Sequence, residues 1–185
     1  MTLPDRTFEV AFGRQGRDRP YRLRLPDRAT APAPLVLELH GRGISPVMFD
    51  RWTGYSALAD EAGFVLAMPR AVGEVWNDVR YGGARWPEHD AIDDVGYLLG
   101  VADDVSSRHP IDPSRIYVVG MSNGALMAGR LAWVHPERIA AVAQVAGTLA
   151  LAIAKQGHSP TPVPVLEIHG TRDRSVPYPG GRAAL

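Results

Sequence analysis

The stretch Arg115-Ile116-Tyr117-Val118-Val119-Gly120-Met121-Ser122-Asn123-Gly124-Ala125-Leu126-Met127 decides the expected fold. Its β-branched and aromatic run, Ile116 to Val119, is typical of a buried strand. A Gly-x-Ser-x-Gly pattern follows, and a helix-forming run continues from Ala125 to Val134. A strand, a sharp turn and a helix in this order form the setting of a nucleophile elbow, which exposes a serine hydroxyl at its tip. The stretch therefore predicts Ser122 as a nucleophile.

The two glycines of the pattern fit this interpretation. Neither Gly120 nor Gly124 has a Cβ, so a strand and a helix can pass closely at the turn. The five-residue pattern alone is weak, because a glycine-rich turn around a buried serine would satisfy it equally well. The strand before it and the helix after it carry the prediction.

Composition and charge narrow the class of protein. The 185 residues are 45% hydrophobic and 22% charged, which predicts a single soluble domain over residues 1–185. Lys plus Arg and Asp plus Glu both number 20, and this balance argues against nucleic acid or an anionic membrane as the main partner. The absence of cysteine excludes disulfides, thiolate zinc sites and a cysteine nucleophile. We expect no cofactor and no metal, and the oligomeric state stays open.

The N-terminal residues 1–6 lack the apolar core of a secretion signal, and no segment approaches the length of a membrane span. As written, the sequence is that of a cytoplasmic protein. A signal removed beforehand would leave the same trace, in which case the protein would be secreted.

The N-terminal part alternates between apolar and polar residues. Residues 8–12 alternate loosely and residues 21–25 strictly, which predicts a β-hairpin at a sheet edge. A run of arginines accompanies it, and we interpret this run as a solvated face because no aromatic residues for stacking on bases are interleaved. The run consists of Arg14, Arg17, Arg19, Arg22, Arg24 and Arg28.

Strand-like and helical segments then alternate. Apolar runs predict buried strands at 35–39, 64–68, 139–145 and 163–169. Ser45-Pro46 predicts the start of one helix that continues to Ala62, and apolar spacing predicts a second over 92–105. The acids Asp93, Asp94, Asp103 and Asp104 on the second helix are expected to face solvent. This alternation predicts an α/β fold with a mostly parallel sheet and an N-terminal antiparallel hairpin.

Chemically useful residues follow three of the predicted strands. In an open α/β sheet, ligands bind beyond the carboxyl ends of the strands, so His40-Gly41-Arg42, Ser122 and Asp173 would meet at one rim. A serine nucleophile needs a base, an acid that orients the base, and donors for the oxyanion. We assign the acid to Asp173 and the oxyanion hole to the backbone N–H groups of Asn123 and Arg42. Asp173 is also compatible with a simple turn or cap acid.

The loop over residues 70–90 is long enough to indicate a functional role. Its aromatic residues Trp76, Tyr81 and Trp86 are candidates for lining a substrate pocket, although core packing is an equal alternative. His40, which follows a strand, would shape the neighbouring loop, and we count it among the candidate substrate-binding residues.

Several motifs resemble one known family. These are Gly120-Met121-Ser122-Asn123-Gly124-Ala125, Asp93-Asp94-Val95-Gly96-Tyr97 and Ile168-His169-Gly170-Thr171-Arg172-Asp173 with the following Val176-Pro177-Tyr178 and Gly180-Gly181, together with Trp76-Asn77. In this order they resemble the polyhydroxybutyrate depolymerase and feruloyl esterase-like α/β-hydrolases. The resemblance implies a serine esterase, with Ser122 as nucleophile, Asp173 as triad acid and Asn77 in the substrate-binding loop.

The chain departs from that family in its histidines. The family places its catalytic histidine well beyond the acid, whereas His40, His89, His109, His135, His158 and His169 all precede Asp173. His89, in the long loop, is the only substitute base we consider. We expect an α/β-hydrolase domain that is C-terminally incomplete, truncated before its last strand and helix.

Three functions are compatible with these residues. The first is hydrolysis of a small-molecule or polymer ester through an acyl-enzyme on Ser122, impaired in this chain because the base is missing. The second is a non-catalytic protein that uses the same scaffold to bind a ligand. The third is a peptidase of the same fold.

Overall fold

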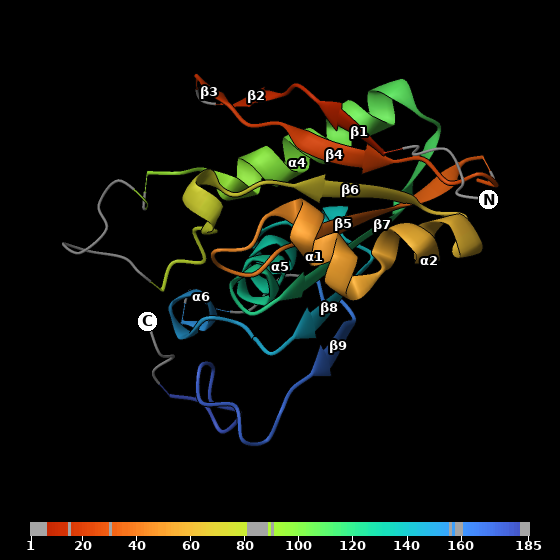
Figure 1. Cartoon of the computed structure of the whole chain (residues 1–185). Coiled ribbons are helices and arrows are strands. Elements are labelled where there is room, and N and C mark those ends of the chain that lie inside the picture. Colours follow the sequence, from red (N-terminus) through yellow and green to blue (C-terminus); the bar gives the residue numbers. More distant parts are fainter. Residues whose placement is uncertain are drawn as a thin grey trace.

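The computed structural model describes residues 7–14, 16–29, 31–80, 89, 91–155, 157 and 161–181. A seven-stranded sheet runs through the described part, with strand order β1-β4-β6-β5-β7-β8-β9 (Figure 1). The two pairs at the β1 end are antiparallel and the remaining pairs are parallel. The α/β class, the mostly parallel sheet and the antiparallel N-terminal hairpin are therefore confirmed.

The strands lie close to their predicted positions. The main sheet consists of β1 (Thr7–Val10), β4 (Tyr21–Arg24), β5 (Ala33–Leu39), β6 (Val65–Pro69), β7 (Ile111–Met121), β8 (Ala141–Val145) and β9 (Val165–Ile168). A separate two-stranded sheet joins β2 (Gly13–Arg14) to β3 (Arg17–Asp18) at the tip of the hairpin. Strand β7 begins earlier than the predicted 116, because Ile111 already pairs with Ala33 of β5.

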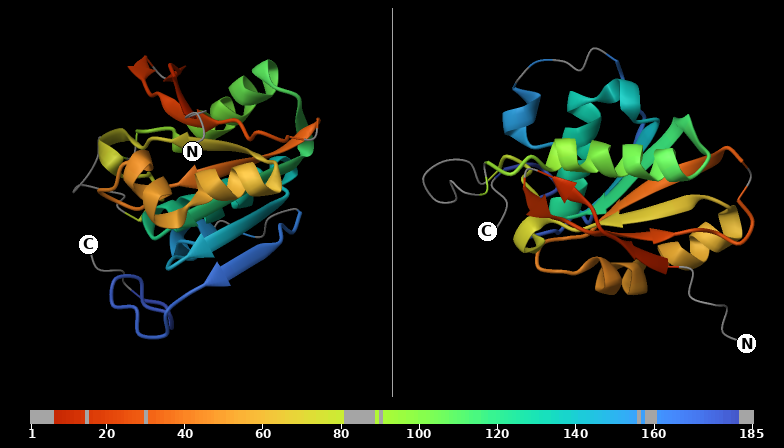
Figure 2. Two further views of the ribbon diagram at one scale, coloured as in Figure 1. Left: turned by 45° about the vertical axis from the view of Figure 1, so that its right-hand side comes forward. Right: turned by 90° about the horizontal axis from the view of Figure 1, so that it is seen from above.

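Helices cover both faces of the sheet. They are α1 (Pro46–Thr53), α2 (Tyr55–Ala62), α4 (Asp94–Arg108), α5 (Asn123–Val134), α6 (Leu151–Ala154) and the 3₁₀ turns η1 (Val72–Glu74) and η2 (Pro136–Arg138). Figure 2 shows α4 and α5 on one face and the pair α1 and α2 on the other. This layering buries the parallel strands on both sides.

The predicted single helix over 46–62 is wrong, because Gly54 divides it. Gly54 adopts φ 72°, a left-handed conformation that ends α1, and its N–H donates to the Asp50 carbonyl. The Asp50 carboxylate then accepts hydrogen bonds from the backbone N–H of Ser56 at 2.8 Å and from its hydroxyl at 2.7 Å. One acidic side chain thus stabilises the start of the second helix.

The main core lies between the sheet and the two helices α4 and α5. The apolar positions predicted for α4 are confirmed, since Val95, Leu98, Ala102 and Val105 are buried against the strands. Met127, Ala128 and Leu131 supply the facing surface of α5. This packing holds the start of α5 against the carboxyl ends of the central strands.

Two predicted solvated faces are partly buried instead. Arg19, Arg24 and Asp94 are at most 8% exposed, so the solvent-facing prediction is wrong for them. Arg19, just before β4, pairs with Asp94 of α4 at 2.5 Å. Arg24 of β4 donates from its Nε to Asp60 of α2 at 3.0 Å. A buried charge needs such a partner, and the partner comes from a distant part of the chain.

The helices of the described residues are all too short or too polar to cross a bilayer.

One buried acid stands out in the central strand β5. Glu38 is 2% exposed, and its Oε1 accepts a 2.6 Å hydrogen bond from the Thr53 hydroxyl. Its Oε2 is buried, and no hydrogen-bond partner for it lies among the described residues. Burial raises the pKa of Glu38 to about 7, helped by the charge of Asp50 and opposed by the Thr53 hydrogen bond.

This burial predicts a pH-dependent stability. The folded protein binds the Glu38 proton more tightly than the unfolded chain, so the stabilising contribution is complete below the ordinary pKa of 4.5 and is lost as pH rises through about 7. We expect the free energy of unfolding of the wild type to fall by about 3 kcal/mol over this pH window. Glu38→Gln, which keeps an acceptor for Thr53, should abolish this fall. Urea unfolding at several pH values measures it. Glu61→Gln, at an exposed position of α2, should keep the wild-type slope, and a Glu38→Gln slope equal to wild type would contradict the assignment.

Candidate active site

The strand, sharp turn and helix predicted around Ser122 are present at the end of β7. Ser122 adopts φ 54° and ψ −118°, between the last residue of β7 and the first residue of α5. Its N–H donates to the Val145 carbonyl at 2.8 Å, and its own carbonyl accepts from the Leu126 N–H at 3.1 Å. Positive φ is costly for a serine, so the residue is held in this conformation by the surrounding structure. The side chain is half-buried, not enclosed.

Backbone contacts at the two glycines explain how the turn is held. A Cβ at Gly120 would lie 2.3 Å from the Gly124 carbonyl oxygen, and a Cβ at Gly124 would lie 2.2 Å from the Leu39 carbonyl oxygen. Both obstacles are backbone atoms that cannot rotate away. Glycine at these positions therefore lets α5 start directly against the ends of β7 and β5.

The loop after β5 lies beside the elbow. A Cβ at Gly41 would be 3.6 Å from the Met121 carbonyl oxygen, and the Gly43 N–H donates to the Glu74 carbonyl at 2.9 Å. Arg42, between these glycines, is exposed at the same rim. Asn123 occupies the first position of α5, where a backbone N–H has no acceptor within the helix.

His40 is buried within this loop. Its Nδ1 lies 2.8 Å from the Gly41 carbonyl oxygen, and its Nε2 accepts a hydrogen bond from the Ala71 N–H at 3.1 Å. These partners require a hydrogen on Nδ1 and none on Nε2. Burial lowers the pKa of His40, which keeps the ring neutral. The side chain is 0% exposed, so in this conformation it supports the loop from inside.

Trp76 and Asn123 are joined by their polar atoms. The backbone N–H of Trp76 donates to Asn123 Oδ1 at 2.7 Å. In return, Asn123 Nδ2 donates to the Trp76 carbonyl at 3.0 Å and to Asp78 Oδ2 at 2.6 Å. The Trp76 indole Nε1 donates to the His40 carbonyl at 2.9 Å. Both side chains are at most 1% exposed.

Asn77 connects the same loop to α4 and α5. Its N–H donates to Asp94 Oδ2 at 2.6 Å, its Nδ2 donates to the Ile92 carbonyl at 3.0 Å, and its carbonyl accepts from Arg130. Burial raises the pKa of Asp94, while Arg19 and the Asn77 N–H act in the opposite direction. Our sequence reasoning missed the role of Asp94. The acidic pair Asp93-Asp94 at the start of the predicted helix was the feature of the sequence that could have indicated it. Asp93 caps α4 by accepting a hydrogen bond from the Gly96 N–H at 2.8 Å, whereas Asp94 binds the Asn77 N–H.

Asp173 lies in the turn after β9, at the carboxyl end of the parallel strands. Its Oδ1 accepts hydrogen bonds from the N–H groups of Ser175 at 2.7 Å and Val176 at 3.0 Å. These bonds lower its pKa. Its Oδ2 is 3.5 Å from His169 Nε2, which also lies 2.7 Å from the Val176 carbonyl. The carboxylate is thus charged and fixed by its own turn.

Some of the remaining candidate residues lie within the ranges that the structure describes, and others do not. Tyr81, Trp86 and His158 lie outside the described residues. His109 and His135 cap the C-terminal ends of α4 and α5. His89 Nε2 lies 2.9 Å from the Val75 carbonyl oxygen. Within the described ranges no group of three or more acidic or histidine side chains could hold a metal ion.

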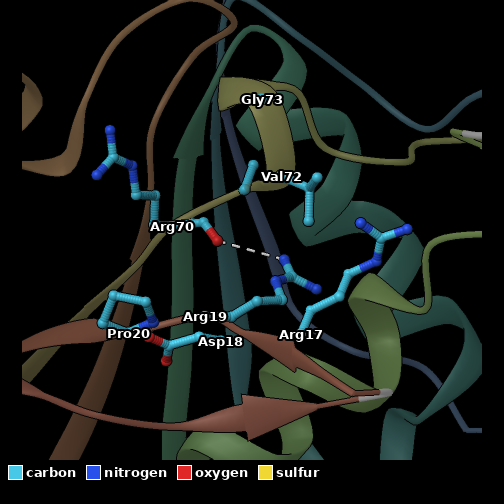
Figure 3. A pocket seen from close by; sticks show the side chains of 8 residues that line it. Arg17, Asp18, Arg19, Pro20, Arg70, Val72 and Gly73 are labelled. Atoms are coloured by element: carbon cyan, nitrogen blue, oxygen red, sulfur yellow. Dashed lines mark hydrogen bonds between the residues drawn. The ribbon is translucent and has the colours of Figure 1, made fainter.

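A hollow of about 300 Å³ lies beside the carboxyl end of β6, and β5 separates this strand from the elbow strand β7 (Figure 3). It is lined by Arg17, Asp18, Arg19, Pro20, Arg70, Ala71, Val72 and Gly73. Figure 3 shows the Arg19 guanidinium directed at the Arg70 carbonyl, which accepts its hydrogen bond at 3.3 Å. Ala71, whose N–H binds His40, connects the hollow to the site, but Ser122 does not line it.

The chain is similar in sequence to a known protein family. A model of the phospholipase/carboxylesterase family matches residues 89–184, a range that includes the elbow. The chain belongs to the phospholipase/carboxylesterase family. The predicted resemblance to depolymerases and feruloyl esterases is confirmed at the same time.

Two relatives illustrate the relationship. A putative esterase NocK of Nocardia uniformis subsp. tsuyamanensis is 40% identical over 169 residues, which cover 89% of this chain and 48% of the relative. Poly(3-hydroxyalkanoate) depolymerase C of Paucimonas lemoignei is 30% identical over 128 residues, covering 66% and 30% respectively. The chain thus spans about half or less of the curated relatives it matches.

A solved structure supports the fold. A thermostable esterase matches with a TM-score of 0.77 at 20% identity, over 95% of this chain and 49% of that one. The predicted α/β-hydrolase fold is confirmed by this match and by the strand order of the sheet.

The strain at Ser122 can be tested through stability. A residue forced to positive φ costs about 1–3 kcal/mol, and glycine relieves this cost while losing about 0.5–1 kcal/mol in chain entropy. We expect Ser122→Gly to be about 1 kcal/mol more stable than Ser122→Ala in urea unfolding. Ser122→Ala is the matched control, because it removes the same hydroxyl and keeps the strain. Equal stability of the two variants would show that the turn is not strained at this residue.

Proposed function

We propose that this protein hydrolyses carboxylic esters through an acyl-enzyme on Ser122. The observation that carries the proposal is the strained serine at the end of β7, with a helix starting directly behind it. Membership of a family of carboxylesterases and phospholipases supports the same chemistry.

The reaction assigns a role to each element of the rim. Ser122 Oγ bonds to the acyl carbon and gives its proton to a general base, and the alcohol leaves with a proton. Water then cleaves the acyl-serine. The backbone N–H groups of Asn123 and Arg42 would stabilise the negative oxygen of the tetrahedral intermediate, since both lie beside the elbow.

Asp173 is the proposed acid of the triad. It follows the second strand after the nucleophile strand, and its lowered pKa keeps it ionised. An ionised carboxylate can orient a histidine and stabilise the imidazolium that forms when the histidine accepts the serine proton.

The described histidines do not offer this base readily. His109 lies before the start of β7, a strand of roughly 35 Å, whereas Ser122 lies after its end. His135 is separated from Ser122 by the whole of α5, roughly 18 Å. The ring nitrogens of His40 lie against the Gly41 carbonyl and the Ala71 N–H, and those of His169 against Glu167 and the Val176 carbonyl. We therefore propose that this chain turns over esters slowly, because none of these four described histidines is placed to take the serine proton.

For the substrate we propose a small-molecule or polymer ester, since the chain is similar to a putative esterase and to a poly(3-hydroxyalkanoate) depolymerase. Tyr81 and Trp86 remain candidates for contacting it. Trp76, Asn77 and His40 would form the wall behind the binding site, because all three are at most 4% exposed.

A fluorophosphonate probe tests the proposal on the 185-residue chain. Its phosphorus bonds to Ser122 Oγ, fluoride leaves, and the serine proton passes to solvent. Oxyanion donors contribute about 10²-fold or more to such reactions, so we expect Ser122 to be labelled about 10²-fold faster than an ordinary exposed serine. Mass spectrometry of the digested protein identifies and quantifies the labelled serine.

Matched variants define the outcomes. Ser122→Ala should lose the label, whereas Ser114→Ala, at an exposed serine of β7, should keep it. His89→Ala should leave the labelling rate unchanged. A wild-type chain that resists the probe would favour a non-catalytic binding protein, and loss of labelling in His89→Ala would identify His89 as the base. Faster cleavage of an amide than of the matching ester would indicate a peptidase.

A further inference from the structure

Three segments that are distant in sequence meet at Trp76. They are the loop 40–43 after β5, the loop 71–80 after β6, and the first turn of α5. The Trp76 indole N–H donates to the His40 carbonyl in the loop 40–43. The backbone N–H and carbonyl of Trp76 bind the Asn123 side chain in the first turn of α5. The same residue therefore bridges the two segments that carry the backbone N–H groups of Arg42 and Asn123.

Further contacts hold the bridging loop against the first segment. The Ala71 N–H donates to His40 Nε2 at 3.1 Å, and the Glu74 carbonyl accepts from the Gly43 N–H at 2.9 Å. The His40 and Trp76 rings lie 5.1 Å apart between centroids at an interplanar angle of 41°. Arg42 therefore lies in the sequence between His40 and Gly43, which are both hydrogen-bonded to the loop 71–80.

The strand pairing alone does not set this geometry. The register of β5 and β7 ends with Leu39 opposite Gly120, before Arg42 and Asn123 are reached. Beyond this point, the described hydrogen bonds connect the two segments through the loop 71–80, and within that loop Trp76 binds both segments itself. Stabilisation of an oxyanion depends on donors that are already in place, and a displacement of about 1 Å can cost 10²-fold in rate.

We propose that Trp76 is a positioning residue, which sets the separation of the two oxyanion-binding N–H groups through its indole and peptide hydrogen bonds. This inference rests on the proposed function. Trp76 is 0% exposed, so it acts through His40 and Asn123 and not by touching the substrate. Asn123 has a double role, with its backbone facing the oxyanion and its side chain holding Trp76.

Binding of phenylboronic acid measures this role without a catalytic base. Ser122 Oγ bonds to boron, the boron takes up the oxygen lone pair and becomes a tetrahedral anion, and the serine proton passes to solvent. The adduct carries its negative charge on the tetrahedral boron and places a boron-bound hydroxyl oxygen where the oxyanion would form. Boron NMR detects the tetrahedral species, and titration gives its Kd.

Trp76→Phe removes the indole N–H and keeps an aromatic ring. We expect its Kd for phenylboronic acid to rise about tenfold, less than for loss of a donor itself. The control is Trp133→Phe in α5, a partly buried tryptophan that packs in a separate cluster around Leu126, and its Kd should equal that of the wild type. Ser122→Ala should give no tetrahedral signal.

The outcomes separate the two proposals. Absence of a tetrahedral adduct in the wild-type protein would overturn the proposed function. A wild-type adduct together with an unchanged Kd in Trp76→Phe would overturn only the role of Trp76.

A measurement on the wild-type protein covers the case in which Trp76→Phe does not fold. If boronate binding requires the bridge, it must stabilise the bridge in return. We expect boronate to slow hydrogen exchange of the Trp76 indole N–H more than that of the Leu37 amide in the centre of β5. Equal slowing at both positions would contradict the proposal, because it would report only stabilisation of the whole fold.

Discussion

The structure depends on a close backbone contact between the first turn of α5 and the end of β5. A Cβ at Gly124 would lie 2.2 Å from the Leu39 carbonyl oxygen, so only glycine permits the helix to start there. At the residue before this helix, Ser122 adopts φ 54° and is half-buried. This contact brings the start of α5 to the end of β5, and beyond it the loop 71–80 holds the loop 40–43 and the Asn123 side chain.

Around this contact, buried polar groups are paired across long sequence distances. Asn123 binds Trp76 and Asp78, Asn77 binds Asp94, and Asp94 binds Arg19. A buried polar group without a partner is costly, so each pair restricts its loop to one arrangement. A rigid set of loops is what an enzyme needs when its donors must be in place before charge develops.

Local patterns predicted much of the fold. The spacing of apolar residues identified the buried face of α4, and the β-branched run before Ser122 identified β7, because both depend only on neighbours within a few residues. The division of the helix at Gly54 was missed, although Asp50 and Ser56 lie close in sequence. The burial of Arg19, Arg24 and Asp94 could not be predicted, because their partners lie in other segments.

The sequence by itself determined the order of strands and helices along the chain, the sharp turn at Ser122 and the place of Asp173 after a strand, because short-range sterics and periodicity encode them. Only the tertiary structure decided what surrounds them. It showed that His40 and Trp76 are interior residues and that Asp94 supports a loop. These roles depend on hydrogen bonds between segments 15 to 75 residues apart, and no local pattern specifies such partners.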